Sequence, residues 1–212
     1  MNTSGNKKCS YFAIAGNIGA GKSSLTTLLA KHFNWKAYYE SVDENPYLTD
    51  FYDNMTRWSF NLQRYFLASR FKSQKQFLSL DESFVQDRTI YEDVEVFAKN
   101  LYQMGLMSKR DYQNYRSLFD EVVAFLTPPD LLIYLRAEVP TLVRQIQKRG
   151  RAYESRIRID YLEKLNTLYE EWIGQYPGDL LIVDTDHIDF VNNPEHLGKV
   201  IEMIEQRRFG LF

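Results

Sequence analysis

The segment GNIGAGKS, residues 16–23, constrains the fold more than any other part of the sequence. It matches the pattern G-x-x-x-x-G-K-[ST] in full, and it lies directly after the apolar run YFAIA and before the helical pattern SSLTTLLAKHF. In this context the backbone N–H groups of a glycine-rich turn and the positive end of the following helix bind phosphate groups. The pattern therefore predicts a parallel α/β domain that holds the phosphates of a nucleotide.

The residues of this loop have distinct roles in phosphate binding. Gly16, Gly19 and Gly21 allow the backbone to turn so that successive N–H groups face the phosphate oxygens. Lys22 supplies a positive charge for the β- and γ-phosphates, and the hydroxyl of Ser23 is suited to Mg²⁺. The predicted nucleotide-binding residues are therefore Gly16, Asn17, Ile18, Gly19, Ala20, Gly21, Lys22, Ser23 and Ser24.

The composition is that of one compact domain. The chain has 212 residues and a mass of 25.1 kDa, and its 26 Lys and Arg against 28 Asp and Glu argue against a polynucleotide partner. Cys9 is the single cysteine, so no internal disulfide can form, and no apolar run approaches the roughly 20 residues that span a bilayer. We predict a cytoplasmic protein with no membrane partner, one domain over residues 11–212 and a mobile tail over residues 1–10.

Short apolar runs alternate with amphipathic segments along the chain, as in parallel α/β folds. We predict five buried strands, at Tyr11–Ala15, Lys36–Glu40, Ser83–Asp87, Leu131–Leu135 and Leu180–Asp184, in a five-stranded parallel sheet flanked by helices. The helical period predicts helices over residues 23–33, 57–78, 93–104, 109–126, 140–148, 160–175 and 194–207.

One predicted helix carries polar residues on an otherwise apolar face. Phe60, Gln63, Leu67 and Arg70 lie near one another on the helix over residues 57–78. This face could line a polar cavity, or it could mark the boundary between a buried and a solvated side. The periodicity does not choose between the two.

Several classes of phosphate-loop protein are excluded by missing elements. The D-x-x-G and N-K-x-D elements of a GTPase do not occur, and a chain of this size and charge lacks the extra domains and basic surface of a translocating motor. A phosphotransferase for a small molecule remains. Glu40, Asp87 and Arg88 follow predicted strands and would lie at the carboxyl edge of the sheet beside the phosphate loop. Charged residues also follow buried strands simply because strands end at solvent, so the position of Glu40 leaves both interpretations open.

Five segments together resemble a known family. They are GNIGAGKS, ESVDENPYL, RWSFNLQRYFLASR, QDRTIYED and KRGRAYES, and they occur in the order and spacing of the deoxynucleoside kinases, especially the short bacterial deoxyadenosine and deoxyguanosine kinases. The resemblance runs from about residue 11 to residue 184. It implies the phosphate-loop kinase fold with an arginine-rich lid over residues 149–156, ATP and Mg²⁺ as cofactors, and a homodimer, for which residues 109–126 are a candidate contact.

The resemblance implies roles for the residues at the sheet edge. Glu40 corresponds to the general base for the sugar 5′-hydroxyl, and Arg88 to the arginine that holds this carboxylate and the 5′-oxygen. Asp87 corresponds to the acid that completes the Mg²⁺ shell with Ser23. The catalytic residues implied in this way are Glu40, Arg88, Lys22, Arg149 and Arg151.

Further residues correspond to the family's nucleoside pocket. Gln63, Arg70 and Asp93 match the polar groups that read the base, and Phe97 matches the aromatic residue that stacks on it. Without the resemblance, Phe97 would be interpreted as a core residue. Two more residues, Tyr52 and Glu154, match those that hold the sugar 3′-hydroxyl, and the lid cations Arg149 and Arg151 would close over the phosphates.

Departures from the family's motifs bear on the choice of base. The element E-P-V reads ESV here, the element D/E-R-S reads DRT, and Tyr153 replaces an acidic residue of the lid. The segment ENPY, residues 44–47, resembles the bacterial purine enzymes. We therefore predict ATP-dependent phosphorylation of the 5′-hydroxyl of a purine deoxynucleoside in nucleotide salvage. Deoxycytidine or broad specificity is the alternative, and a nucleoside monophosphate kinase or a nucleotide-binding regulator is less favoured.

Overall fold

The computed structural model describes residues 9–40, 45–79, 81–151, 154 and 156–209. Parts of four sequence predictions therefore lie outside the described residues: most of the tail before residue 11, the SV of ESV, Glu44 of ENPY, and Tyr153 of the lid. At the start of the described part, the Ser10 backbone N–H donates to the Ser83 hydroxyl at 3.0 Å.

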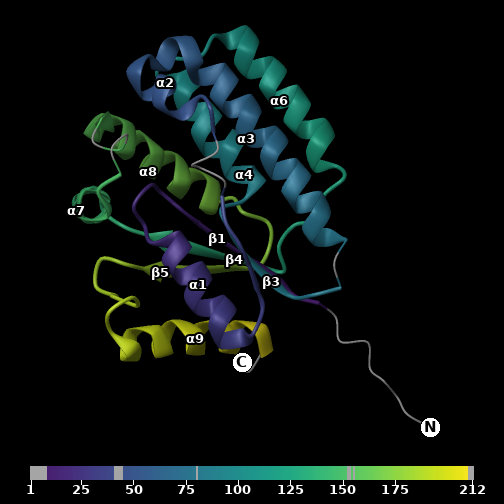
Figure 1. Cartoon of the computed structure of the whole chain (residues 1–212), viewed down its shortest axis with the longest axis vertical. Helices are drawn as coiled ribbons and strands as arrows, with labels where there is room; N and C mark the ends of the chain where they lie inside the picture. The colour runs from purple at the N-terminus through teal and green to yellow at the C-terminus, as the bar shows by residue number, and fades with distance from the viewer. Residues whose placement is uncertain (1–8, 41–44, 80, 152–153, 155, 210–212) are drawn as a thin grey trace.

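Five parallel strands form the centre of the molecule, which confirms the predicted sheet (Figure 1). In space their order is β2-β3-β1-β4-β5, and their bounds are β1 Tyr11–Gly16, β2 Lys36–Tyr38, β3 Phe84–Asp87, β4 Leu131–Arg136 and β5 Leu180–Asp184. In the register of the sheet, Ile14 pairs with Asp87 and Gly16 pairs with Leu135. The phosphate loop and the end of β3 therefore leave the sheet at the same edge.

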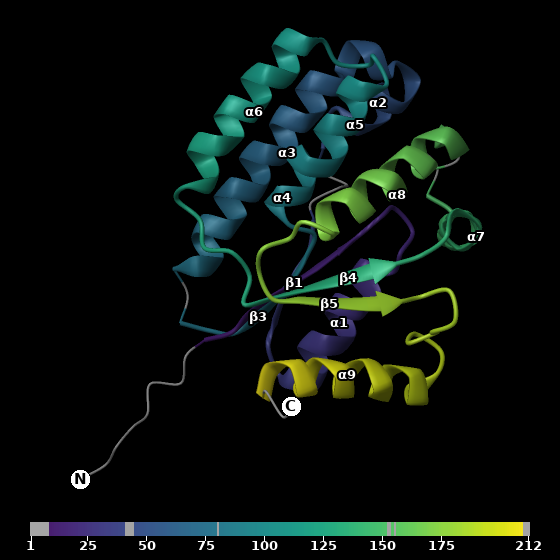
Figure 2. The ribbon, with the colours of Figure 1, turned by 180° about the vertical axis from the view of Figure 1, so that it is seen from behind.

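Helices cover both faces of the sheet. Alternate apolar side chains of β1 belong to two separate clusters, one on each face, together with residues of the helices that cover that face. Phe12 and Ile14 pack toward the face covered by α1 (Lys22–Phe33) and α9 (Pro194–Phe209). Tyr11, Ala13 and Ala15 belong to the opposite cluster, which includes residues of α3 (Met55–Leu78), α6 (Lys109–Val123) and α8 (Ile159–Ile173). Figures 1 and 2 show these two layers on either side of the sheet.

The helix expected over residues 93–104 differs from the prediction in two ways. It begins earlier, with α4 (Ile90–Glu92), and continues through η1 (Asp93–Ala98) into α5 (Lys99–Gln103). The segment η1 is a π-helix, a form that is rare and is found mostly at functional sites. Its side chains are spaced for contacts with α3 and α8, which a periodicity based on the α-helix does not anticipate.

Two further helices carry residues that line the cavity described below. One of them, α2 (Leu48–Asp53), was not predicted, because a segment of six residues is too short to show a helical period. The helix α7 (Val139–Arg149) ends at Gly150, whose φ of 67° is the left-handed conformation that commonly ends helices.

Among the described residues no helix is both long and apolar enough to cross a membrane.

Candidate active site

The phosphate loop requires glycine at the positions where its backbone passes close to the backbone of β4 and of α7. Gly16 and Gly19 have φ values of 150° and 88°. A Cβ atom at Gly19 would lie 2.8 Å from the carbonyl oxygen of Leu142, and one at Gly16 would lie 2.9 Å from that of Leu135. Both positions are therefore closed to larger residues by backbone atoms, which cannot move aside as a side chain can.

Lys22 lies folded against its own loop. Its Nζ donates to the carbonyl oxygens of Gly16 and Asn17, at 2.9 Å each. Burial, and then the charge of Arg88, lower the pKa of Lys22 to about 7. The ammonium group thus lies at the mouth of the loop without a carboxylate in contact, in a site that favours an anionic ligand.

Ser23 and Asp87 meet where α1 begins and β3 ends. The Ser23 hydroxyl donates to Oδ2 of Asp87 at 2.5 Å, while Oδ1 of Asp87 is buried without a hydrogen-bond partner. A hydroxyl and an unpartnered carboxylate oxygen fit Mg²⁺, which prefers oxygen ligands and retains several waters. In the described part of the chain no group of three or more His, Cys, Asp and Glu that could hold a metal occurs.

Glu40 is held between two arginines from different elements. Its Oε1 accepts from Nη2 of Arg70 at 2.6 Å, and its Oε2 accepts from Nε of Arg88 at 3.1 Å. Burial would raise the pKa of Glu40, but Arg70 and Arg88 outweigh it and lower the pKa to about 2. The carboxylate therefore remains ionised at every physiological pH.

Arg70 extends this chain of charges to Asp93. Its Nε donates to Oδ2 of Asp93 at 2.7 Å, and both side chains are almost fully buried. Burial raises the pKa of Asp93 to about 6, although Arg70 acts in the opposite direction. Arg70 thus joins Glu40, near the phosphate loop, to Asp93 on η1.

Arg88 adopts an unusual backbone conformation for a non-glycine residue. Its φ of 68° lies in the left-handed region, and its backbone N–H donates to Ile14 at 2.9 Å. The guanidinium stacks over the ring of Phe97, with 4.5 Å between Cζ and the ring centroid. Such strain persists only where surrounding contacts over-determine it, and it is common at functional sites.

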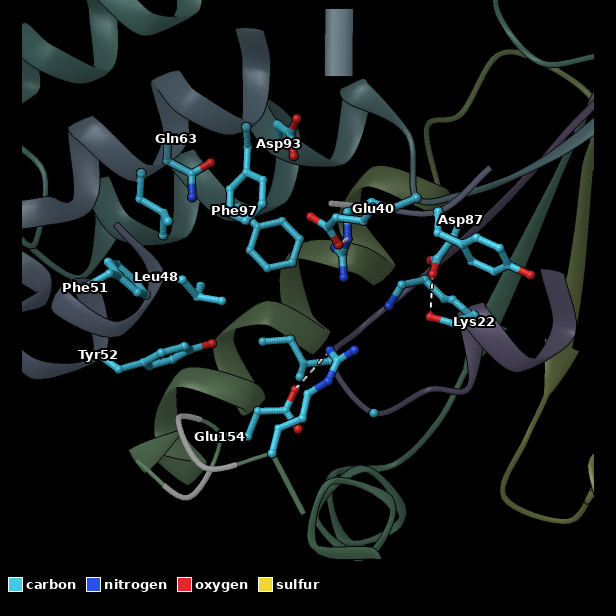
Figure 3. Close-up of a pocket in the computed structure, with 18 of the residues that line it drawn as sticks. Lys22, Glu40, Leu48, Phe51, Tyr52, Gln63, Asp87, Asp93, Phe97 and Glu154 are labelled. Carbon is cyan, nitrogen blue, oxygen red and sulfur yellow. Dashed lines mark hydrogen bonds and ion pairs between the residues drawn. The ribbon is translucent and has the colours of Figure 1, made fainter. Parts of the chain in front are cut away.

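These residues surround a cavity of about 300 Å³, a volume at the lower end for small-molecule sites. Figure 3 shows Gln63 and Asp93 toward one end, Lys22 and Asp87 at the other, and Glu40 between them. Gln63 is 2% exposed, and its Oε1 has no hydrogen-bond partner. An unpartnered acceptor that lines a cavity indicates a ligand with a hydrogen-bond donor.

The polar face of α3 therefore belongs to a cavity and not to a solvated boundary. Gln63 and Arg70 line it, whereas Leu67, predicted on the same face, is buried in the core. Phe66 also lines the cavity, and sequence analysis missed it although it lies three residues after Gln63. The other lining residues that were missed are Tyr39, Leu48, Phe51, Leu62 and Tyr161, and they had no comparable signal.

Three described lid residues, Arg149, Arg151 and Glu154, also line this cavity. Glu154 lies across the cavity from Asp93 (Figure 3). Arg149 makes two contacts with the Glu154 carboxylate, one of them from Nε at 3.0 Å, and Nη1 of Arg151 lies 3.8 Å from the same group. Tyr52, from α2, lines the cavity on the same side as Glu154 (Figure 3). All the predicted substrate-binding residues therefore line one cavity.

A second cleft, of about 700 Å³, adjoins the first. Its walls are the phosphate loop, α7 and the loop after β5, and Gly19, Lys22, Ser23, Arg149 and Arg151 line both spaces. His187 and Asp189 lie in this cleft, where Asp189 accepts from the backbone N–H groups of Val191 and Asn192. Two ligands can therefore meet at the loop and the lid arginines.

The comparisons with known proteins identify the family. A model of the deoxynucleoside kinase family matches residues 12–207 of the chain. The chain belongs to the deoxynucleoside kinase family. This result confirms the resemblance carried by the five motifs, and it confirms the prediction of a kinase that acts on a deoxynucleoside.

Individual relatives match over most of their length. The deoxyadenosine/deoxycytidine kinase of Bacillus subtilis (strain 168) is 42% identical over 93% of this chain and 92% of its own. The deoxyguanosine kinase of the same organism is 35% identical over 92% of this chain and 96% of its own. A structure of the deoxyadenosine kinase from M. mycoides, with products dCMP and a flexible dCDP bound, has a TM-score of 0.82 at 33% identity, covering 92% of this chain and 99% of the other. The deoxynucleoside kinase fold is thus confirmed.

Proposed function

We propose that this deoxynucleoside kinase transfers the γ-phosphoryl group of ATP to the 5′-hydroxyl of a purine deoxynucleoside, for nucleotide salvage. The observation that carries the proposal is the pair of adjoining spaces, which share Lys22, Ser23, Arg149 and Arg151. ATP would occupy the cleft of about 700 Å³ and the nucleoside the cavity of about 300 Å³. The transferring phosphoryl group would then lie at their junction.

In this mechanism Glu40 accepts the proton of the 5′-hydroxyl. With a pKa of about 2, Glu40 is a weak base, so it accepts the proton only as the new P–O bond forms. In a largely dissociative transfer this is sufficient, because catalysis depends mainly on positioning and charge. Arg88 orients Glu40, and Lys22, Arg149 and Arg151 stabilise the charge that spreads over the phosphoryl oxygens.

Mg²⁺ would be held by Ser23 and Asp87 together with phosphate oxygens and water. Bound there, the ion would neutralise charge on the β- and γ-phosphates. The Ser23 hydroxyl and the unpartnered Oδ1 of Asp87 are the oxygen atoms of this pair that could serve as ligands.

The groups near the base favour a base with an exocyclic amino group. Gln63 offers an unpartnered oxygen, and the ionised Asp93 is an acceptor as well. Adenine, guanine and cytosine carry an amino donor, whereas thymine does not. Deoxycytidine is the second candidate, since the relative at 42% identity is named a deoxyadenosine/deoxycytidine kinase.

A nucleoside monophosphate as acceptor is disfavoured by charge. Its phosphate would need unpaired cations in the acceptor cavity, but Arg70 and Arg88 are both paired with carboxylates there. A non-catalytic regulator would not need the Glu40 carboxylate in the acceptor cavity, between the groups near the base and Lys22.

The test is an initial-rate comparison of deoxyadenosine, deoxyguanosine, deoxycytidine, thymidine, adenosine and dTMP, with ATP and Mg²⁺ and direct identification of the product. A purine deoxynucleoside should give the highest kcat/KM. Glu40→Gln should abolish the rate and leave ATP binding intact. Phosphorylation of dTMP alone, or an active Glu40→Gln protein, would refute the proposed roles.

We also propose a cytoplasmic homodimer that uses residues 109–126, which comprise α6 and the turn after it. Tyr115 and Phe119 of this segment are buried, whereas Leu118 and Phe125 are 46% and 76% exposed. A second copy would cover the two exposed apolar side chains. Sedimentation equilibrium should give twice the mass of the chain, and Phe125→Asp should weaken the association; an unchanged dimer in this variant would exclude this segment as the contact.

A further inference from the structure

Glu92 is a buried carboxylate that lies behind the active site. Its side chain has no exposed surface, and it lines neither the nucleoside cavity nor the nucleotide cleft. Burying a carboxylate is unfavourable unless hydrogen bonds and cations compensate for the lost hydration. The contacts that provide this compensation reveal its function.

One carboxylate oxygen, Oε2, stabilises the turn that follows Arg88. The backbone N–H of Thr89 donates to it at 2.6 Å, and the Thr89 hydroxyl lies at 3.1 Å. Thr89 and Glu92 thereby form a capping box at the start of α4. The contacts fix the backbone directly after Arg88, the residue with the left-handed conformation.

The other oxygen, Oε1, joins three elements that are distant in sequence. It accepts from the Tyr169 hydroxyl of α8 at 2.7 Å and from the backbone N–H of Gly16 at 3.3 Å. Nη1 of Arg88 lies 3.5 Å from this oxygen and also donates to the Tyr169 hydroxyl at 2.9 Å. The phosphate loop, the helix after the lid and the arginine that holds Glu40 therefore meet at one carboxylate oxygen.

We infer that Glu92 is a positioning residue for phosphoryl transfer, which holds the Arg88 guanidinium against Glu40 and ties the phosphate loop to the Arg88 turn. The inference rests on the proposed function, in which Glu40 and Arg88 act on the acceptor hydroxyl. Glu92 does not touch the substrate, so it acts through Arg88, Tyr169 and Gly16. A displacement of about 1 Å in such a group can lower the rate on the order of 10²-fold.

The test measures steady-state kinetics of Glu92→Gln, which preserves the shape of the side chain and removes its charge. We expect kcat to fall by about 10- to 100-fold, while KM for the deoxynucleoside changes less than about threefold. A purely structural role would lower Tm without this separation of kcat from KM in the folded protein.

Two further variants separate positioning from folding. Tyr169→Phe leaves the capping box intact but removes the hydroxyl between Glu92 and Arg88, so kcat should fall in a protein with nearly unchanged Tm. Glu95→Gln is the matched control, because Glu95 lies on η1, is 30% exposed, and pairs with Arg116 at 2.9 Å outside both cavities. Its kinetics should equal those of the unmodified enzyme.

Several outcomes would overturn the inference. One is a Glu92→Gln protein with a lower Tm but unchanged kcat and KM, since Glu92 would then only cap α4. If Glu92→Gln does not fold, Tyr169→Phe decides, because an unchanged kcat in this variant would also overturn the inference. Failure of the proposed function is distinguishable, since the unmodified protein would then phosphorylate no deoxynucleoside, and the inference would fail with it.

Discussion

Burial determines the pKa values of individual side chains in this site, and Lys22 is the clearest example. In the free protein its pKa is about 7, because burial and Arg88 oppose the ammonium form. The negative charge of a bound triphosphate would favour that form and raise the pKa. Nucleotide binding is therefore linked to protonation of Lys22.

We predict that nucleotide binding at about pH 8 takes up a proton, and that this uptake disappears below about pH 6, where Lys22 is already protonated. Isothermal titration calorimetry in buffers of different ionisation enthalpy measures the number of protons. The Lys22→Met protein is the control, and it should show no uptake at either pH. Equal uptake by both proteins would assign the proton to another group.

Asp93 gives a prediction for the acceptor side. With a pKa raised to about 6 by burial, it becomes protonated as the pH falls through that value and then loses its ion pair with Arg70. The value of kcat/KM for the deoxynucleoside should therefore fall below about pH 6, and Asp93→Asn should remove this limb and leave a low, flat profile. Glu40, with a pKa of about 2, cannot cause it.

The control for this profile is kcat/KM for ATP in the same pH range. Asp93 does not line the nucleotide cleft, so this value should not show the Asp93 limb. A limb that persists in Asp93→Asn would show that another group titrates.

At the scale of elements, the lid and α2 together form one side of the cavity, at the proposed position of the sugar. Glu154 anchors Arg149 and lies with Tyr52 on one side of the cavity. If Glu154 holds the 3′-hydroxyl, a dideoxynucleoside that lacks this group should lose about tenfold or more in kcat/KM with the unmodified enzyme. Glu154→Gln should lower kcat/KM for the deoxynucleoside and reduce this discrimination. Equal discrimination by both proteins would remove Glu154 from that role.

At the scale of the whole molecule, the two spaces meet at shared residues of the phosphate loop and lid. A dinucleotide that joins adenosine to the deoxynucleoside through a 5′-polyphosphate chain should therefore bind more tightly than either half alone. Competition with ATP and with the deoxynucleoside, measured separately, tests this prediction. A ligand that competes with only one substrate would show that the spaces do not bind both nucleosides at once.

Much of this architecture is encoded in local patterns. The glycine loop between β1 and α1, the five apolar strands and the polar residues on α3 could be predicted because each depends on neighbouring residues in the chain. The family's motifs also located Glu40, Arg88 and Asp93, although not their contacts. Boundaries differed by a few residues, and the short helix α2 had no periodic signal.

Other features arise only when distant elements pack together. Arg70 contacts Glu40 across 30 positions of the chain, and Tyr169 contacts Glu92 across 77. The π-helical segment of η1 likewise forms in contact with α3 and α8. Packing brings these charges together and excludes water from them, so the pKa values of Lys22 and Asp93 are properties of the folded molecule and cannot be assigned from residue type.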